Sequence, residues 1–247
     1  MPADPTHLAA LALLVLLSAV LYSSVGHGGA SAYLAAMTLL GVAPGATKPA
    51  ALVMNITVAL VGTVRFASAS LVPWRRLGPL CAASIPAAFL GGYLELPLRA
   101  HRILLGAILI IAAFRLWLPM RDRSRRAWPS SAWLAGIGAS LGILAGLTGV
   151  GGGIFLSPLL ILSGWEEPRR TAGASATFIL VNSVAGLLGH LQAPRGIPEG
   201  TALLAVVALA GGLYGSWLGA RRFAPVTLLR LLGAVLLLAG VKLLLTR

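Results

Sequence analysis

Long apolar stretches alternate with short polar connections along the whole chain. Inside these stretches polar and apolar residues do not alternate as they would in a half-buried strand. A segment in lipid must satisfy its own backbone N–H and C=O groups, which a helix does. We therefore predict an all-α polytopic membrane protein with helices near residues 8–25, 29–41, 49–66, 77–94, 102–118, 132–148, 153–164, 171–191, 201–220 and 226–245.

Two of these segments, 29–41 and 153–164, are too short to cross the hydrocarbon core, which needs about 20 residues. Each directly follows a glycine cluster. SSVGHGGA at 23–30 leads into the first short segment, and LTGVGGGIFL at 147–156 runs into the second. The pattern predicts a Gly-rich helix break followed by a short helix, once in each half of the chain.

The two halves resemble each other in sequence. VGHG at 25–28 corresponds to VGGG at 150–153, and both halves follow the order long, short, long, long, long. Many secondary transporters are built from such repeats, with the substrate site where the broken helices meet. We predict two homologous halves, a first membrane repeat at 1–118 and a second at 132–247, joined by a basic cytoplasmic linker at 119–131.

Composition agrees with a membrane location. Of the 247 residues 58% are hydrophobic and 10% are charged, whereas a soluble domain has about 25% charged residues. The net charge of +13 comes from short basic groups between apolar segments, as the positive-inside rule produces, so we expect no nucleic-acid partner. A single cysteine, Cys81, excludes an intramolecular disulfide framework.

The distribution of basic residues does not decide whether the chain crosses the membrane eight or ten times. If all ten segments cross, 13 basic residues lie inside and 6 outside, with both chain ends outside. If each short segment only completes a re-entrant hairpin, eight crossings remain, the split is 11 to 8, and both ends lie inside. The first apolar segment lacks a positive n-region, so we expect it to stay as a membrane helix.

The glycine clusters suit an anion. Backbone without Cβ can approach a ligand closely, and a helix that starts after a break offers N–H groups with partial positive charge. Close helix packing is the alternative role of such glycines. We predict that the clusters bracket one small anion, with substrate-binding residues Ser24, Gly26, His27, Gly28, Gly29, Asn55, Thr148, Gly149, Gly151, Gly152, Gly153, Ser175 and Asn182.

Other polar side chains within the apolar segments have two interpretations. Asn55 and Asn182 either line a pathway or join helices by hydrogen bonds, since an amide in lipid needs a partner. His27 either binds the anion or couples to protons when charged, or is a neutral hydrogen-bonded histidine. Lys48 and Arg65, near helix ends, are expected to reach the membrane interface.

The absence of certain residue types and motifs from the sequence excludes several classes of function. All six acidic residues fall in ends or connections, where a carboxylate does not serve cation transport across the bilayer. The sequence contains no metal-ligand cluster, no catalytic constellation and no nucleotide-binding motif. We therefore expect no enzymatic activity, no metal and no cofactor.

Two stretches carry a family resemblance. GLTGVGGGIFLSPLLILSGWEEPRRTAGASATFILVNSVAGLLGHL at 146–191 resembles the second-half signature of the sulfite exporter TauE/SafE family of bacterial membrane permeases, and VGHGGASAYLAAMTLLGVAPGATKPAALVMNITVALVGTVRF at 25–66 is similar to its first half. The resemblance implies a carrier of sulfite, sulfonates or related organic acids in the cytoplasmic (inner) membrane. His27 departs from the family pattern, which more typically has glycine there.

These observations together give a functional hypothesis. We expect a secondary transporter, or permease, that moves a small anion by alternating access at the paired Gly-rich breaks. Its partners would be the anionic substrate and the lipid bilayer, and a homo-oligomer is compatible with the sequence. A cation or metal permease using His27 and His190 and a non-transporting scaffold subunit remain as alternatives, with a membrane enzyme third.

Overall fold

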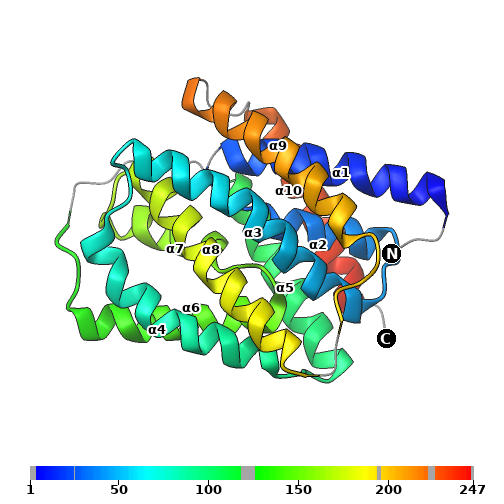
Figure 1. Ribbon diagram of the computed structural model, residues 1–247, viewed down its shortest axis with the longest axis horizontal. Coiled ribbons are helices and arrows are strands. Elements are labelled where there is room, and N and C mark those ends of the chain that lie inside the picture. The colour runs from blue at the N-terminus through cyan, green and yellow to red at the C-terminus, as the bar shows by residue number, and fades with distance from the viewer. Residues whose placement is uncertain (1–3, 25, 118–125, 194–195, 222–225, 246–247) are drawn as a thin grey trace.

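The computed structural model describes residues 4–24, 26–117, 126–193, 196–221 and 226–245, which form ten helices and no strand (Figure 1). Nearly every bound lies within a few residues of the predicted one. Several helices begin earlier than predicted because their first turn is polar or starts at a proline, as α3 and α8 do. The helices are α1 (Pro5–Ser24), α2 (Ala30–Leu39), α3 (Pro44–Ser68), α4 (Trp74–Tyr93), α5 (Leu98–Trp117), α6 (Ser131–Thr148), α7 (Gly153–Leu162), α8 (Pro168–Leu191), α9 (Thr201–Arg221) and α10 (Val226–Leu245).

Large apolar side chains cover much of the outer surface. Leu13, Val206 and Leu238 are each more than half exposed, as are Leu60 and Trp133 among others. Four of the described helices, α1, α3, α6 and α8, are long and apolar enough to cross a membrane. The prediction of an all-α polytopic membrane protein is therefore confirmed.

Helices α4 and α6 run parallel in close contact. Three glycines at every fourth position of α6 face three successive turns of α4, so a side chain on any of them would meet α4 backbone. Small residues permit such close approach between membrane helices. The facing pairs are Gly138 with Leu80, Gly142 with Ser84 and Gly146 with Ala88.

The short helix α7 returns the chain to the end of the bundle where α6 begins. The Arg126 N–H, just before α6, donates to the Gly164 carbonyl just after α7 at 2.7 Å. The Trp128 and Trp165 rings stack there with centroids 6.0 Å apart. We call this the linker end of the bundle.

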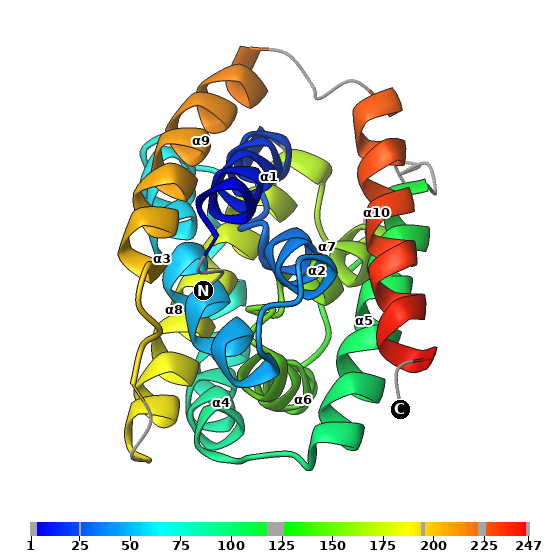
Figure 2. The same ribbon diagram turned by 90° about the vertical axis from the view of Figure 1, so that its right-hand side faces the viewer.

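The opposite end, which we call the cavity end, collects the ends of α4, α8 and α10 and the starts of α3 and α5. Figure 1 shows α1 beginning and α10 ending at the same side, and Figure 2 looks onto that side. Helix α2 also ends at this side. The Lys242 ammonium, near the end of α10, donates a hydrogen bond to the carbonyl of Thr38 in the last turn of α2 at 3.1 Å. Helix α2 thus ends at the side where α1 begins, and α7 ends at the side where α6 begins. Whether eight or ten segments cross the membrane stays a prediction.

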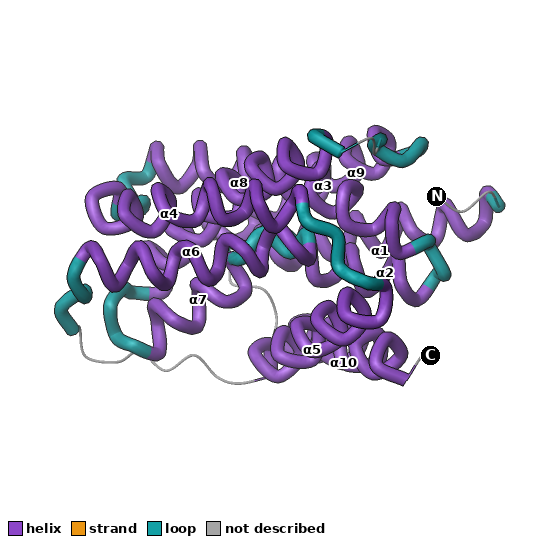
Figure 3. Tube along the Cα trace, turned by 90° about the horizontal axis from the view of Figure 1, so that it is seen from below, coloured by secondary structure: helices purple, strands orange, loops and turns teal. Residues whose placement is uncertain are grey.

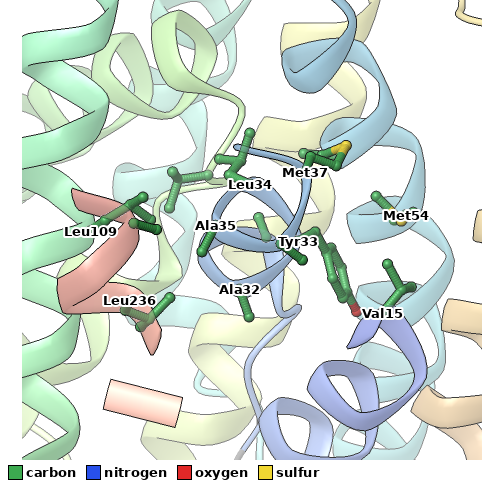
Figure 4. Close-up of a cluster of buried hydrophobic side chains, with 14 of the residues drawn as sticks. Val15, Ala32, Tyr33, Leu34, Ala35, Met37, Met54, Leu109 and Leu236 are labelled. Atoms are coloured by element: carbon green, nitrogen blue, oxygen red, sulfur yellow. The ribbon is translucent and has the colours of Figure 1, made fainter. Parts of the chain in front are cut away.

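Helix α2 lies in the centre of the larger apolar core. Every residue from Ala30 to Met37 is buried. Figure 4 shows α2 side chains surrounded by Val15 of α1, Met54 of α3, Leu109 of α5 and Leu236 of α10. Its counterpart α7 is covered on fewer sides, and its last residue Leu162 is 52% exposed.

Helix lengths follow the same order in the two halves, 20, 10, 25, 20 and 20 residues and then 18, 10, 24, 21 and 20. Figure 3 shows α5 and α10 as a pair set to one side of the other helices. The two-half repeat and its domain limits stay a prediction, with which this order of lengths agrees.

Candidate functional site

The two helix breaks meet at Asn55 in the middle of α3. A Cβ added at Gly28 of the first break would lie 2.7 Å from Asn55 Oδ1. A Cβ added at Gly151 of the second break would lie 2.8 Å from Asn55 Nδ2. Both would also lie 3.0 Å from the side chain of Ile179 on α8. Two segments more than 120 residues apart in sequence therefore converge on one point between α3 and α8.

Glycine is required in the breaks because the backbone turns through left-handed conformations. Gly29 and Gly152 precede the first residues of α2 and α7 with φ of 92° and 80°. L-residues with a side chain seldom adopt such angles. Gly26, Gly149 and Gly151 also have positive φ, so both clusters contain backbone conformations that favour glycine.

Helices α2 and α7 start inside the protein with no side-chain cap. Within the described part of the chain, no hydrogen bond has the N–H of Gly28, Gly29, Gly151, Gly152 or Gly153 as its donor. The residues around both starts are buried, apart from the half-exposed His27. Buried N–H groups are nearly always paired, so these two helix starts are suited to receive an acceptor.

Asn55 and Ser183 add polar atoms at the same place. Asn55 is fully buried, and its Nδ2 donates to the Val150 carbonyl at 3.3 Å, while its Oδ1 has no partner among the described residues. Ser183 Oγ is also buried without a described partner, and a Cβ on Gly151 would lie 3.0 Å from it. Unpaired polar atoms in a dry interior cost free energy, so they mark a place where a polar ligand is stabilised.

Each break also packs against a helix of the opposite half. Gly26 contacts Ala172, one turn into α8, so closely that a Cβ would overlap it. Gly149 contacts Lys48, one turn into α3, where a Cβ would lie 3.0 Å from the Lys48 carbonyl oxygen. The first break therefore approaches the centre from the linker end and the second from the cavity end.

Several predicted site residues make local hydrogen bonds instead of facing Asn55. Ser24 Oγ donates to Leu21 O, Thr148 Oγ1 to Leu144 O, and Asn182 Nδ2 to Phe178 O, each within one helix. Ser175 Oγ is 2.7 Å from Ser157 Oγ, which joins α8 to α7.

The amide of Asn182 keeps one buried oxygen, Oδ1, without a partner among the described residues. His27 is half-exposed, and its ring meets the edge of the Tyr22 ring with centroids 6.2 Å apart. The hydrogen bond from Asn182 to the Phe178 carbonyl and the ring contact between His27 and Tyr22 do not include Asn55.

A cavity of about 430 Å³ opens at the cavity end and borders the second break. Leu147, two residues before Gly149, lines it together with Lys48, so the cavity adjoins the path from Gly149 to Gly151. The remaining lining residues are Gly45, Leu94, Glu95, Leu96, Leu98, His101, His190 and Gly196.

Lys48 differs from its expected interfacial position. The side chain is only 7% exposed, and its ammonium donates to the carbonyls of Gly91 and Gly92 at 3.1 and 3.0 Å. The last carbonyls of a helix carry partial negative charge, which attracts a cation. Arg65, in contrast, is exposed in the last turn of α3, and its position at the membrane interface stays a prediction.

Sequence reasoning missed His101 and gave Lys48 the wrong environment. Both line the large cavity, and both lie within or near the first turns of helices that begin at the cavity end. The one sequence feature that marks Lys48 is its place directly before Pro49 in an apolar region.

Comparisons with known proteins agree on one group. The family described as "Sulfite exporter TauE/SafE" matches residues 11–243 of the chain. The "Probable membrane transporter protein y4hK" of Sinorhizobium fredii is 34% identical over 246 residues, covering 95% of this chain and 97% of that protein. No solved structure matches the chain.

Proposed function

The chain belongs to the sulfite exporter TauE/SafE family and is a membrane transporter, and from this premise we propose that it carries a small anion across the inner membrane of a bacterium. Sulfite, a sulfonate or a related organic acid is the proposed substrate class. The protein works as a secondary carrier by alternating access and has no enzymatic role.

One observation carries the proposal: two uncapped helix starts converge on Asn55. The N-terminus of a helix bears roughly half a positive charge and presents free N–H groups. Two such ends around one point stabilise a negative charge without a fixed cationic side chain. This explains how an anion site exists in a region where sequence places no charged residue.

Asn55 and Ser183 complete the proposed site by recognising the shape of the anion. The N–H groups of Gly28, Gly29, Gly151 and Gly152 donate to its oxygens. Ser183 Oγ donates a further hydrogen bond, and Asn55 Oδ1 accepts one from a hydroxyl on the substrate, as in hydrogensulfite or a hydroxylated organic acid. A neutral donor-rich site of this kind favours oxyanions over metal cations.

Alternating access is supported by the crosswise contacts of the breaks. The first break packs on α8 near the linker end and the second on α3 near the cavity end. Movement of α3 relative to α8 opens the path along one break while the other stays packed. Asn55, held by the Val150 carbonyl of the opposite half, lies where the two paths join.

Flux assays with the purified protein in liposomes test the proposal. We expect the wild-type protein to carry sulfite as hydrogensulfite, and Asn55→Ala to reduce that flux by about tenfold or more, since one lost hydrogen bond to a charged group is worth roughly 1.5–3 kcal/mol. Ser140→Ala, on an exposed face of α6, is the matched control and should keep normal flux.

The outcome decides between the anion carrier and its alternatives. Transport of a divalent metal without any anion flux would refute the anion proposal in favour of a cation permease. Folded protein that moves no solute in either direction would instead favour a scaffold subunit.

A further inference from the structure

The only two lysines of the chain, Lys48 and Lys242, lie at the same end of the molecule and bind helix ends in the same way. The Lys48 ammonium donates to the Gly91 and Gly92 carbonyls at the end of α4. The Lys242 ammonium donates to the Thr38 and Leu39 carbonyls at the end of α2, at 3.1 and 3.2 Å. Each amine is thereby fixed in position at the mouth of a cavity.

Two cavities adjoin at this end and share His101. The larger, about 430 Å³, is lined by Lys48, His190 and His101 among others. The smaller, about 210 Å³, is lined by His101, Arg102 and Lys242, with Thr38, Gly41, Val42, Thr47, Leu105 and Leu243. His101 therefore stands between them, and its buried Nε2 has no partner among the described residues.

The charged groups that line the two cavities are mainly positive. Lys48, Lys242 and Arg102 are cations, and Glu95 is the carboxylate. The ends of α2 and α4 contribute about half a negative charge each, which the lysines exceed. A cleft with one excess sign and apolar walls concentrates ions of the opposite sign.

We propose that the two cavities form one anion-collecting vestibule, a second binding site that holds the small anion before it reaches the helix breaks. The identity of its anion rests on the proposed function. Its walls match that chemistry, because fixed ammonium and guanidinium groups attract an oxyanion, and His101 Nε2 lies between the two cavities to hydrogen-bond it in transit.

Lys48 links the vestibule to the central site. Lys48 lines the larger cavity, and a Cβ added at Gly149 of the second break would lie 3.0 Å from the Lys48 carbonyl oxygen. An anion leaving Lys48 meets the Gly149–Gly151 backbone next, and then Asn55. The vestibule is thus joined to one break and lies far from the linker end, where Gly26 is packed against Ala172.

Two arginines one helical turn apart provide the test. Arg102 lines the smaller cavity, whereas Arg99 is exposed at the start of α5 and lines neither. In sulfite flux assays, Arg102→Gln and Lys242→Gln should each raise KM about threefold to tenfold with kcat nearly unchanged, and Arg99→Gln should leave KM at the wild-type value. Equal KM for Arg102→Gln and Arg99→Gln would overturn the vestibule.

Lys48→Gln removes a buried hydrogen-bonded contact at the end of α4, and this variant can fail to fold. The test of the vestibule therefore uses the Arg102→Gln and Lys242→Gln variants. A purely structural role of these residues would lower the amount of folded protein and the flux capacity without raising KM. A rise in KM that disappears at high salt, where surface charge is screened, identifies the electrostatic role.

Sulfite binding separates this inference from the proposed function. Thermal stabilisation by sulfite should persist in Asn55→Ala, which retains the vestibule, and should weaken in Arg102→Gln. If the wild-type protein carries no anion, the proposed function fails. In that case the vestibule is still supported if sulfite raises the unfolding temperature of the wild-type protein and Arg102→Gln abolishes this rise. If sulfite does not stabilise the wild-type protein at all, the vestibule is refuted.

Discussion

At Gly151, space and backbone conformation both exclude a side chain. Its φ is +77°, and a Cβ would lie 2.8 Å from Asn55 Nδ2 and 3.0 Å from Ser183 Oγ. Gly136, on the exposed side of α6, is helical and has nothing within 4 Å of its added Cβ. Replacing each of these two glycines by alanine therefore distinguishes the loss of space and backbone conformation at the proposed site from the general effect of replacing a glycine.

We predict that Gly151→Ala reduces anion flux by about tenfold or more and costs roughly 1–2 kcal/mol of stability through the left-handed backbone. Gly136→Ala should keep normal flux and gain about 0.5–1 kcal/mol, because alanine favours the helix. Liposome flux and thermal unfolding in detergent measure the two effects. Normal flux in folded Gly151→Ala would contradict the role given to this break.

Residues of the proposed site differ in how visible they are in the sequence. The glycines and Asn55 stand out because their chemistry is unusual inside an apolar segment. Lys48 does not, since its burial depends on carbonyls at the end of α4, more than 40 residues away in the chain. Ser183 and His101 likewise gain their meaning only from the packing of other helices around them.

At the scale of elements, the two short helices differ in their surroundings. Leu34 of α2 is fully buried among four other helices, and Leu162 of α7 is 52% exposed. We predict that Leu34→Ala costs about 2–5 kcal/mol, since it leaves a cavity, while Leu162→Ala changes stability by less than about 0.5 kcal/mol. Equal losses in thermal unfolding would mean that Leu162 is buried as fully as Leu34.

The parallel contact of α4 and α6 depends on the small size of three glycines. Gly142 faces the Ser84 backbone with no room for a larger residue. We predict that Gly142→Leu separates the two helices and lowers stability by about 1–3 kcal/mol or more, the usual cost of overpacking. Gly136→Leu, six residues earlier in α6 and exposed, should stay near the wild-type unfolding temperature, and a similar drop in both would count against the contact.

Helix positions follow from sequence more readily than helix partners. Apolar run lengths predict the ten elements, and the two short ones, because burial in lipid is a property of each segment by itself. The starts of α3 and α8 lie before the apolar runs, as proline fits the first helical position. Which helices touch, such as α4 with α6 or α1 with α9, depends on packing that no single segment encodes.

At the scale of the whole molecule, the helix directions and the basic linker together give an orientation. The linker between α5 and α6 carries four arginines, and such loops stay in the cytoplasm. We therefore expect the linker end inside and the cavity end outside, so that the vestibule faces the external solution.

Cysteine labelling in intact cells checks this orientation. In a Cys81→Ser background, Ala43→Cys at the cavity end should react with a membrane-impermeant maleimide from outside. Ser130→Cys at the linker end should react only after the cells are permeabilised. The reverse pattern would invert the orientation and place the vestibule in the cytoplasm.

The crosswise packing of the breaks has a consequence for how the protein is made. Asn55 emerges from the ribosome 95 residues before Val150, whose carbonyl accepts its hydrogen bond. Until then its amide and the start of α2 sit in the nascent membrane chain without their final neighbours. Asn55 therefore gains this partner only after synthesis of the chain has passed Val150.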